Sequence, residues 1–119
     1  MLEDNSRSTE DVINEFNEVF NAHDVDGVMA MMTGDCVFES TRPQPDGERA
    51  EGQEAVRRCW QSLFDGAPNA RFSTEEMFTN GDRCVVRWRY DWGDGHIRGV
   101  DVFKVRDGKV AEKLAYVKG

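Results

Sequence analysis

The sequence predicts a single α+β domain in which helices from the N-terminal half cover an antiparallel sheet built from the C-terminal half. Apolar residues recur at helical spacing as far as residue 66, and beyond Pro68 four strand-like runs are separated by turn sequences. A length of 119 residues allows one hydrophobic core but not two. We therefore expect one domain over residues 1–119, with residues 1–7 frayed.

Three helices are predicted before Pro68. Ser8 or Thr9 can cap the first and Asp24 the second, and the third begins near Gly52. We expect Gly34 to end the second helix. Each helix carries one apolar stripe: Val12, Ile13, Phe16, Val19 and Phe20; then Val25, Val28, Met29 and Met32; then Val56, Cys59, Trp60, Leu63 and Phe64.

The strands are predicted from β-rich runs bounded by turn residues. Residues 36–40 form one strand, and residues 41–51 form a loop because prolines do not suit a sheet interior. After Pro68 an antiparallel meander of four strands is predicted. Its runs are about 71–79, 83–93, 96–106 and 109–117, and its turns are Asn80-Gly81, Asp94-Gly95 and Asp107-Gly108.

Alternation along the strands distinguishes the buried face from the exposed one. In 83–92 the aromatic residues share a face opposite the arginines, and in 96–106 the basic residues all share the outward face. This arrangement leaves Asp101 on the inward face, between Gly99 and Phe103. An inward acid is either a functional group or a structural carboxylate held by a partner such as Lys113.

Turn lengths decide which residues lie opposite Asp101. A two-residue turn at Asp94-Gly95 places Trp88 opposite Asp101 and Tyr90 opposite Gly99. For the last strand, a two-residue turn at Asp107-Gly108 places Leu114 opposite Asp101. A bulge at Gly108 places Lys113 there instead, because one extra residue reverses the face of the strand.

Charge and cysteine content bound the function. The net charge of −8 repels a phosphate backbone, and the short cluster Arg83, Arg87 and Arg89 reads as a solvated strand face, so no nucleic-acid partner is expected. The three cysteines are widely spaced, and with only two histidines they provide no ligand set for a metal. We expect buried, reduced thiols at Cys36, Cys59 and Cys84.

Membrane association is not expected either. The longest apolar run, residues 28–32, is far too short to span a bilayer. The N-terminal residues lack the basic and apolar segments of a secretion signal. A cytoplasmic location is therefore the expectation.

The order of several short motifs resembles the SnoaL-like group of the nuclear transport factor 2 (NTF2) superfamily. The residues that carry the resemblance are Phe20-Asn21-Ala22-His23-Asp24-Val25-Asp26-Gly27, Gly52-Gln53-Glu54-Ala55-Val56-Arg57, Arg98-Gly99-Val100-Asp101-Val102-Phe103 and Asp107-Gly108-Lys109-Val110. The resemblance covers nearly the whole chain. It implies a cone-shaped fold in which helices and a curved sheet enclose a pocket, but it does not fix one activity.

Relatives in this superfamily suggest roles for particular residues. Beside ketosteroid isomerase, Asp101 matches an acid that donates a hydrogen bond, whereas Ser40 and Phe16 replace the base and the tyrosine. An epoxide-hydrolase relative would have an arginine at the position of Gly99. Polyketide cyclases are more similar, because they use an interior acid on this strand for an intramolecular aldol closure.

The resemblance also implies a bulged last hairpin, with Lys113 and Ala115 facing the pocket. We favour this register, which brings Lys113 into contact with Asp101 and keeps the aspartate ionised at neutral pH. A lysine partner lowers the pKa of an acid whereas burial raises it, by comparable amounts, so the geometry decides the sign.

The favoured hypothesis is a cofactor-free enzyme that cyclises or isomerises a small apolar carbonyl compound. Asp101 would move the proton, and Lys113 or Tyr90 would stabilise the enolate. The substrate would contact Trp88, Phe103, Trp60, Phe16, Ser40 and Phe38.

The alternative is a non-catalytic ligand-binding or dimerisation module in which Asp101 is the structural partner of Lys113. In either case we expect a homodimer, because the outward face mixes Val85, Val100 and Val102 with arginines.

Overall fold

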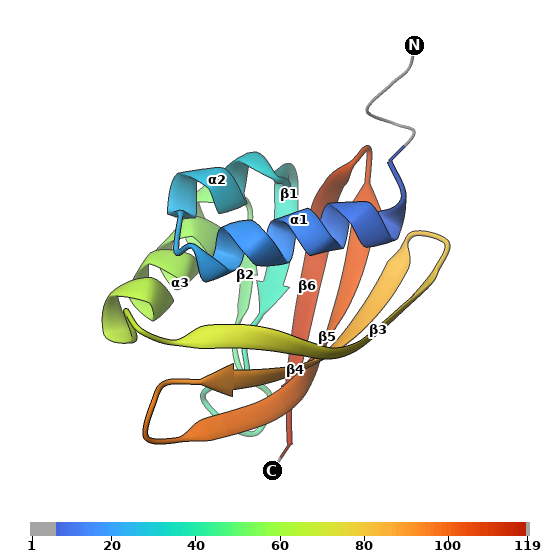
Figure 1. The fold of residues 1–119 in the computed structure, drawn as a ribbon. Helices are drawn as coiled ribbons and strands as arrows, with labels where there is room; N and C mark the ends of the chain where they lie inside the picture. The colour runs from blue at the N-terminus through green and yellow to red at the C-terminus, as the bar shows by residue number, and fades with distance from the viewer. Residues whose placement is uncertain (1–6, 119) are drawn as a thin grey trace.

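The computed structural model describes residues 7–118 and confirms the predicted α+β class (Figure 1). Three helices lie on one face of a six-stranded sheet whose strand order is β2-β1-β6-β5-β4-β3. The elements are α1 (Thr9–Asn21), α2 (Val25–Ala30), β1 (Met32–Glu39), β2 (Arg49–Glu51), α3 (Gln53–Gly66), β3 (Arg71–Asn80), β4 (Arg83–Asp91), β5 (His96–Arg106) and β6 (Lys109–Val117).

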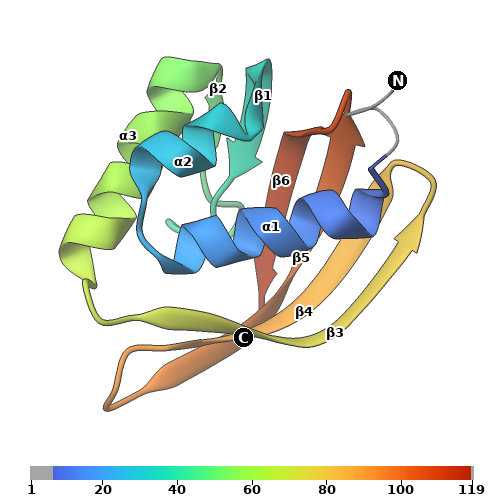
Figure 2. The same cartoon turned by 45° about the horizontal axis from the view of Figure 1, so that its top comes forward.

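The sheet is mixed, which the sequence did not predict. The C-terminal meander is antiparallel as expected, but β1 runs parallel to β6. Figures 1 and 2 show α1 lying across β6, β5 and β4, with α3 over β1 and β2. The meander curves around α1, so the space between α1 and the sheet is where a site can form.

Side chains cap both N-terminal helices as predicted. The Ser8 hydroxyl accepts a hydrogen bond from the Asp11 amide at 3.0 Å, and the Asp24 carboxylate accepts one from the Gly27 amide at 3.0 Å. Of the residues expected to be frayed, 1–6 lie outside the described part of the chain. Arg7 is described, and its guanidinium pairs with Glu15.

The second helix is shorter than predicted, and the first strand is longer. The helix ends at Ala30, and β1 begins at Met32, so Gly34 lies within a strand and does not end a helix. The Val110 amide donates to the Met31 carbonyl at 2.8 Å, and Met32 pairs with Val110. Pairing with β6 therefore replaces the helical turn that the apolar spacing of Met32 suggested.

A short strand interrupts the region predicted as a loop. Residues 49–51 form β2, which pairs antiparallel with the end of β1. Arg49 lies between Glu39 and Glu51, with its nitrogens 2.9 and 2.7 Å from their carboxylate oxygens. The strand has three residues, too few to show alternation.

The register of β4 on β5 differs from the prediction by two residues. The hairpin loop has four residues, 92–95, because Asp91 pairs with His96. Val86 therefore lies opposite Asp101, and Trp88 lies opposite Gly99. Because the shift is an even number, the inward and outward faces remain as predicted.

The last hairpin has both a two-residue turn and a bulge. Arg106 pairs with Lys109 across Asp107-Gly108, whose φ angles of 55° and 75° suit a type I′ turn. The register shifts between Lys104 and Val105, within the strand pair. As a result Ala115 lies opposite Asp101 and Lys113 opposite Phe103, so both predicted partners were wrong, although Lys113 and Ala115 do face inward.

A polar contact joins the helical layer to the first strand. The Gln53 side-chain amide at the start of α3 donates to the carbonyls of Met29, Met32 and Thr33 at 3.3, 3.1 and 3.0 Å. These carbonyls lie at the end of α2 and the beginning of β1, so Gln53 fixes α3 against both. Within residues 7–118, no helix is long and apolar enough to cross a membrane.

Candidate functional site

The candidate site is a buried ion pair between β5 and β6. The Lys113 ammonium lies 3.1 Å from Asp101 Oδ2, and the side chains are only 6% and 5% exposed. Lys113 reaches Asp101 diagonally, since Ala115 is the direct neighbour of Asp101. The contact agrees with the sequence-based expectation, although it arises from a different register.

Aromatic rings surround the Lys113 ammonium. Five ring centroids lie 5.3–5.8 Å from Nζ, within the range of cation–π attraction. They belong to Phe20, Phe38, Trp60, Phe72 and Phe103. The rings compensate part of the cost of burying the charge, and they exclude water from the pair.

One oxygen of the Asp101 carboxylate is left free. Oδ2 meets Lys113, but Oδ1 is buried without a hydrogen-bond partner in the described part of the chain, and so is the indole Nε1 of Trp88. Leaving such groups unpaired costs free energy. A molecule that reached this space could therefore satisfy both groups, provided that the side chains around them moved.

Burial raises the pKa of Asp101 above its ordinary value of 3.8. The charge and hydrogen bond of Lys113 oppose this shift, and the Trp88 indole opposes it weakly, without reaching hydrogen-bond geometry. Loss of hydration outweighs the ion pair, so the pKa is raised although the expected contact with Lys113 is present; that Asp101 is ionised at neutral pH stays a prediction. The shift makes Asp101 a stronger base than an ordinary aspartate.

A small cavity adjoins Asp101. Its volume is about 30 Å³, close to that of one water molecule. It lies between α1, which contributes Asn17, Phe20 and Asn21, and the sheet. The sheet residues that line it are Phe72, Thr74, Val86, Trp88, Asp101 and Lys113. Ligand pockets usually span about 300–1,000 Å³, so a larger molecule enters only if side chains move.

Asn21 ties the two sides of the cavity together. Its amide donates to the Phe72 carbonyl at 2.8 Å, and its side-chain oxygen accepts from the Phe72 amide at 2.8 Å. Asn21 thus pairs with the edge strand β3 as a neighbouring strand would. Next to it, His23 Nε2 lies 3.0 Å from the Ala70 carbonyl and the ring stacks on Phe64 at 4.6 Å, so this histidine has a structural role.

The structure brings together most of the residues predicted for the site. Trp88 lines the cavity beside Asp101 and Lys113. Phe38, Trp60 and Phe103 contact Lys113 from the sides away from the cavity. Phe16 lies one layer further out, 5.8 Å from the Phe103 ring.

Two predicted site residues lie elsewhere. Tyr90 is not among the described residues that line the cavity, and its ring packs on Phe72 at 4.4 Å. The Ser40 hydroxyl donates to the Arg42 carbonyl at 2.7 Å and accepts from the Glu48 amide at 3.0 Å, so it closes the 40–48 loop. Neither residue has a place beside Asp101.

Sequence reasoning missed the residues that form the mouth of the cavity. Phe20 was assigned to the helix stripe, and Asn21 was read only as a helix breaker. Phe72 and Thr74 belong to a strand whose alternation is interrupted at Glu75. An asparagine at a helix end and an interrupted alternation were the available signals.

The cysteines do not provide a nucleophile for this site. Cys36 and Cys84 are buried and Cys59 is partly buried, and all three are free thiols. Burial raises the pKa of Cys84 to about 11, which leaves very little thiolate at neutral pH. Among residues 7–118 no three His, Cys, Asp or Glu side chains are grouped to hold a metal ion.

The fold and the enclosed acid place the protein in the class of NTF2-like α+β proteins. A crystal structure of an NTF2-like protein of unknown function from Mesorhizobium loti is 40% identical, covers 100% of this chain and 98% of its own, and has a TM-score of 0.83. The chain belongs to the SnoaL-like domain family, whose profile matches residues 13–113. No curated protein matches the chain.

More distant structures share the fold. A "putative polyketide cyclase" from Sinorhizobium meliloti is 20% identical, covers 97% of this chain and 100% of its own, and has a TM-score of 0.78. A "putative ketosteroid isomerase" from Kribbella flavida is 19% identical over 93% of this chain and 78% of its own, with a TM-score of 0.79. At these identities the likeness concerns the fold alone.

Proposed function

We propose that the protein is a cofactor-free enzyme that moves a proton on a small, largely apolar carbonyl compound, in a cyclisation or an isomerisation. The observation that supports it is that only one of the two carboxylate oxygens of Asp101 has a partner. Oδ2 is anchored by Lys113, the buried Oδ1 has no partner within residues 7–118, and Asp101 lines the small cavity together with Trp88. A carboxylate oriented in this way is ready to accept a proton.

The chemistry follows from the groups present. Asp101 Oδ1 takes a proton from a carbon next to the carbonyl, and the C–H electron pair forms the enolate double bond as the carbonyl electrons move to oxygen. The Lys113 ammonium has three N–H donors, of which Asp101 engages one, and the Trp88 indole provides another. Either group can stabilise the enolate oxygen.

Two outcomes complete the reaction. In an isomerisation, Asp101 returns the proton to a different carbon of the enolate. In a cyclisation, the enolate carbon attacks a second carbonyl of the same molecule, and the resulting alkoxide takes the proton from Asp101. Both routes regenerate the carboxylate and need no further reactant.

The experiment follows hydrogen exchange next to a ketone. With 2-decalone in D₂O, NMR should show loss of the α-proton signals at a rate that is raised by the protein. Asp101→Asn should abolish the increase, whereas Asp65→Asn, which changes an exposed carboxylate on α3, should leave it unchanged. A rate that is the same for the wild type and Asp101→Asn would contradict the proposal.

The small cavity volume favours a second candidate, a non-catalytic module with a structural ion pair. A cavity of about 30 Å³ has no room for 2-decalone unless Phe20 or Phe72 moves. If 2-decalone does enter the cavity, its binding should change the fluorescence emission of Trp88. The Trp88→Phe variant should then lose that change. If a series of apolar ketones neither exchanges protons nor alters the emission, the structural role is the correct one.

A further inference from the structure

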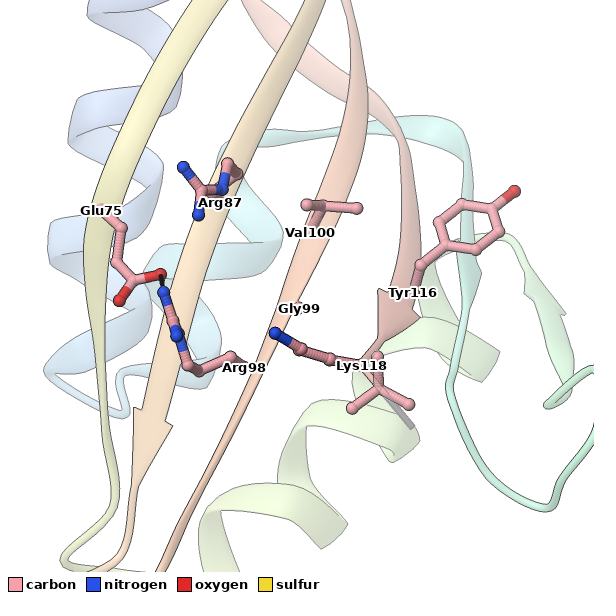
Figure 3. A pocket seen from close by; sticks show the side chains of 8 residues that line it. Glu75, Arg87, Arg98, Gly99, Val100, Tyr116 and Lys118 are labelled. Carbon is pink, nitrogen blue, oxygen red and sulfur yellow. Dashed lines mark hydrogen bonds and ion pairs between the residues drawn. The ribbon is translucent and has the colours of Figure 1, made fainter.

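A second hollow lies on the opposite side of the sheet from Asp101. Its volume is about 270 Å³, nine times that of the inner cavity (270 against 30 Å³). Figure 3 shows it on the outer face of the meander, with side chains from β3, β4, β5 and β6 around it. It is lined by Glu75, Arg87, Arg98, Gly99, Val100, Tyr116, Val117 and Lys118.

The hollow is positively charged in a negatively charged protein. Three cations, Arg87, Arg98 and Lys118, line it with one acid, Glu75, and Glu76 pairs with Arg87 beside it, which leaves a local charge of +1 in a chain whose net charge is −8. In Figure 3 the Lys118 ammonium points past Gly99 toward Arg98. A concentration of one charge in a concave surface attracts ions of the opposite sign.

Strand pairing brings these cations together. The Lys118 amide donates to the Arg98 carbonyl at 2.8 Å, which extends the β5–β6 ladder and places the two side chains together. Arg87 pairs with Val100 on the neighbouring strand. The cluster is therefore set by the backbone and does not depend on flexible side chains meeting by chance.

A β-bulge places the acid. The β3–β4 register shifts between Thr74 and Glu76, so Glu75 is an extra residue that projects onto the outer face. Its Oε1 accepts hydrogen bonds from Arg98 Nε and Nη2 at 3.1 and 2.9 Å. Glu75 thus holds the Arg98 guanidinium beside the hollow.

Most of the guanidinium donors remain available. Each arginine has five N–H groups, of which Glu76 engages one on Arg87 at 2.8 Å and Glu75 engages two on Arg98. Val100 and Tyr116 add apolar surface, and Tyr116 is 57% exposed. Donors beside apolar surface fit a ligand with both an anionic group and a hydrocarbon body.

We propose that this hollow binds a small carboxylate with an apolar or aromatic body, through Arg87, Arg98 and Lys118. The carboxylate lies between the three cations, and the body lies over Gly99 and Val100. This site is separate from the Asp101 cavity, and it stands whether or not the ion pair is catalytic.

The test is an NMR titration of the full chain labelled with ¹⁵N, using benzoate as the probe and benzamide as its uncharged counterpart. Benzoate should cause saturable shifts of the amide signals of Gly99, Val100, Val117 and Lys118, and benzamide should not. Shifts that are equal for the two compounds, or no saturable shift because a second copy of the chain fills the hollow, would overturn the proposal.

Two variants with opposite expectations sharpen the test. Lys118→Gln should weaken benzoate binding about two- to fivefold, the range for one exposed charge pair, and Glu75→Gln should strengthen it by a similar factor. The controls are Lys109→Gln at the start of β6 and Glu54→Gln on α3, which change the net charge by the same amounts away from the hollow. If Lys109→Gln changes the benzoate affinity as much as Lys118→Gln does, and Glu54→Gln as much as Glu75→Gln, then the affinity follows net charge and the hollow is not a specific site.

Discussion

Lys113 binds Asp101 although the two residues are not opposite each other in the sheet. Nζ lies 3.1 Å from Oδ2, while Ala115 is the direct neighbour of Asp101. Diagonal neighbours on an antiparallel pair are separated by about 7–8 Å, a distance that only a long side chain can bridge. The pair therefore depends on the length of lysine as well as on its charge.

Removing the lysine should destabilise the protein strongly. Lys113→Met leaves Asp101 as a buried acid without its cation, and such losses cost about 3–5 kcal/mol of unfolding free energy. Asp101→Asn should cost a similar amount, because it leaves Lys113 as a buried cation without its partner. Urea unfolding at neutral pH measures both values.

The double variant provides the control for this coupling. Asp101→Asn combined with Lys113→Met should cost less than the sum of the two single changes, because no unpaired charge remains. Strict additivity of the three values would show that the two side chains do not interact.

The raised pKa of Asp101 should appear in the pH dependence of stability. Between the ordinary value of 3.8 and the higher value in the folded state, the native protein retains a proton that the unfolded chain has lost. The contribution of Asp101 to the unfolding free energy therefore decreases as the pH rises through this interval.

The contribution of Asp101 is isolated by subtracting the unfolding free energy of Asp101→Asn from that of the wild type at each pH. Asp35, Glu75 and Asp91 have lowered pKa values from hydrogen bonds to Arg106, Arg98 and the Gly93 amide, and they act oppositely in acid. They are common to the wild type and Asp101→Asn. The stability of the wild type minus that of the variant should thus fall with rising pH, and a difference that rises would mean that the pKa is lowered.

Gly99 should not tolerate a side chain. A Cβ atom there would lie 2.2 Å from the Tyr116 carbonyl oxygen and 2.7 Å from the Trp88 ring. Overpacking of this kind costs about 1–3 kcal/mol, and the contact with backbone leaves little room for relief. Gly66→Ala is the control, because nothing lies within 4 Å of its added carbon, and thermal unfolding should separate the two.

The outer sheet face should also support a homodimer, through an apolar row that lies two residues along the strands from Arg87 and Val100 of the hollow. A second copy of the chain would therefore compete with the carboxylate for this face. Phe78, Val85, Val102 and Leu114 are successive partners across four strands, and Phe78 is 55% exposed. An apolar row of this kind favours pairing with a second copy. Light scattering should give twice the 13.6 kDa chain mass. Phe78→Gln should yield monomer, whereas Trp92→Gln, an exposed aromatic in a hairpin loop, should not.

The sequence predicted the faces of the strands better than their partners. Alternation depends only on which residues are apolar, so it correctly assigned Asp101 to the interior, whereas the inward position of Lys113 was inferred from the family resemblance. Registers depend on loop lengths, and the four-residue loop 92–95 contains a turn-like Asp94-Gly95 that suggested a shorter one. The predicted contact between Lys113 and Asp101 exists all the same. It forms diagonally across the strands and not between directly opposite residues.

The size of the cavity was not predictable from residue types. Phe20 and Phe72 close it, and whether an aromatic ring fills a space or borders it depends on tertiary packing. The parallel pairing of β1 with β6 was also invisible, because it joins segments more than 70 residues apart and leaves no local pattern (Met32 pairs with Val110).

That pairing has a consequence for how the chain acquires its structure during synthesis. β6 lies between β1 and β5 in the sheet, so β1 and β2 have no strand to join the meander until residues 109–117 have been made. The inner surface of α1 stays partly uncovered for the same period, because α1 lies across β4, β5 and β6. We therefore expect the complete sheet to form only after β6 has left the ribosome, with apolar surface of α1 exposed until then.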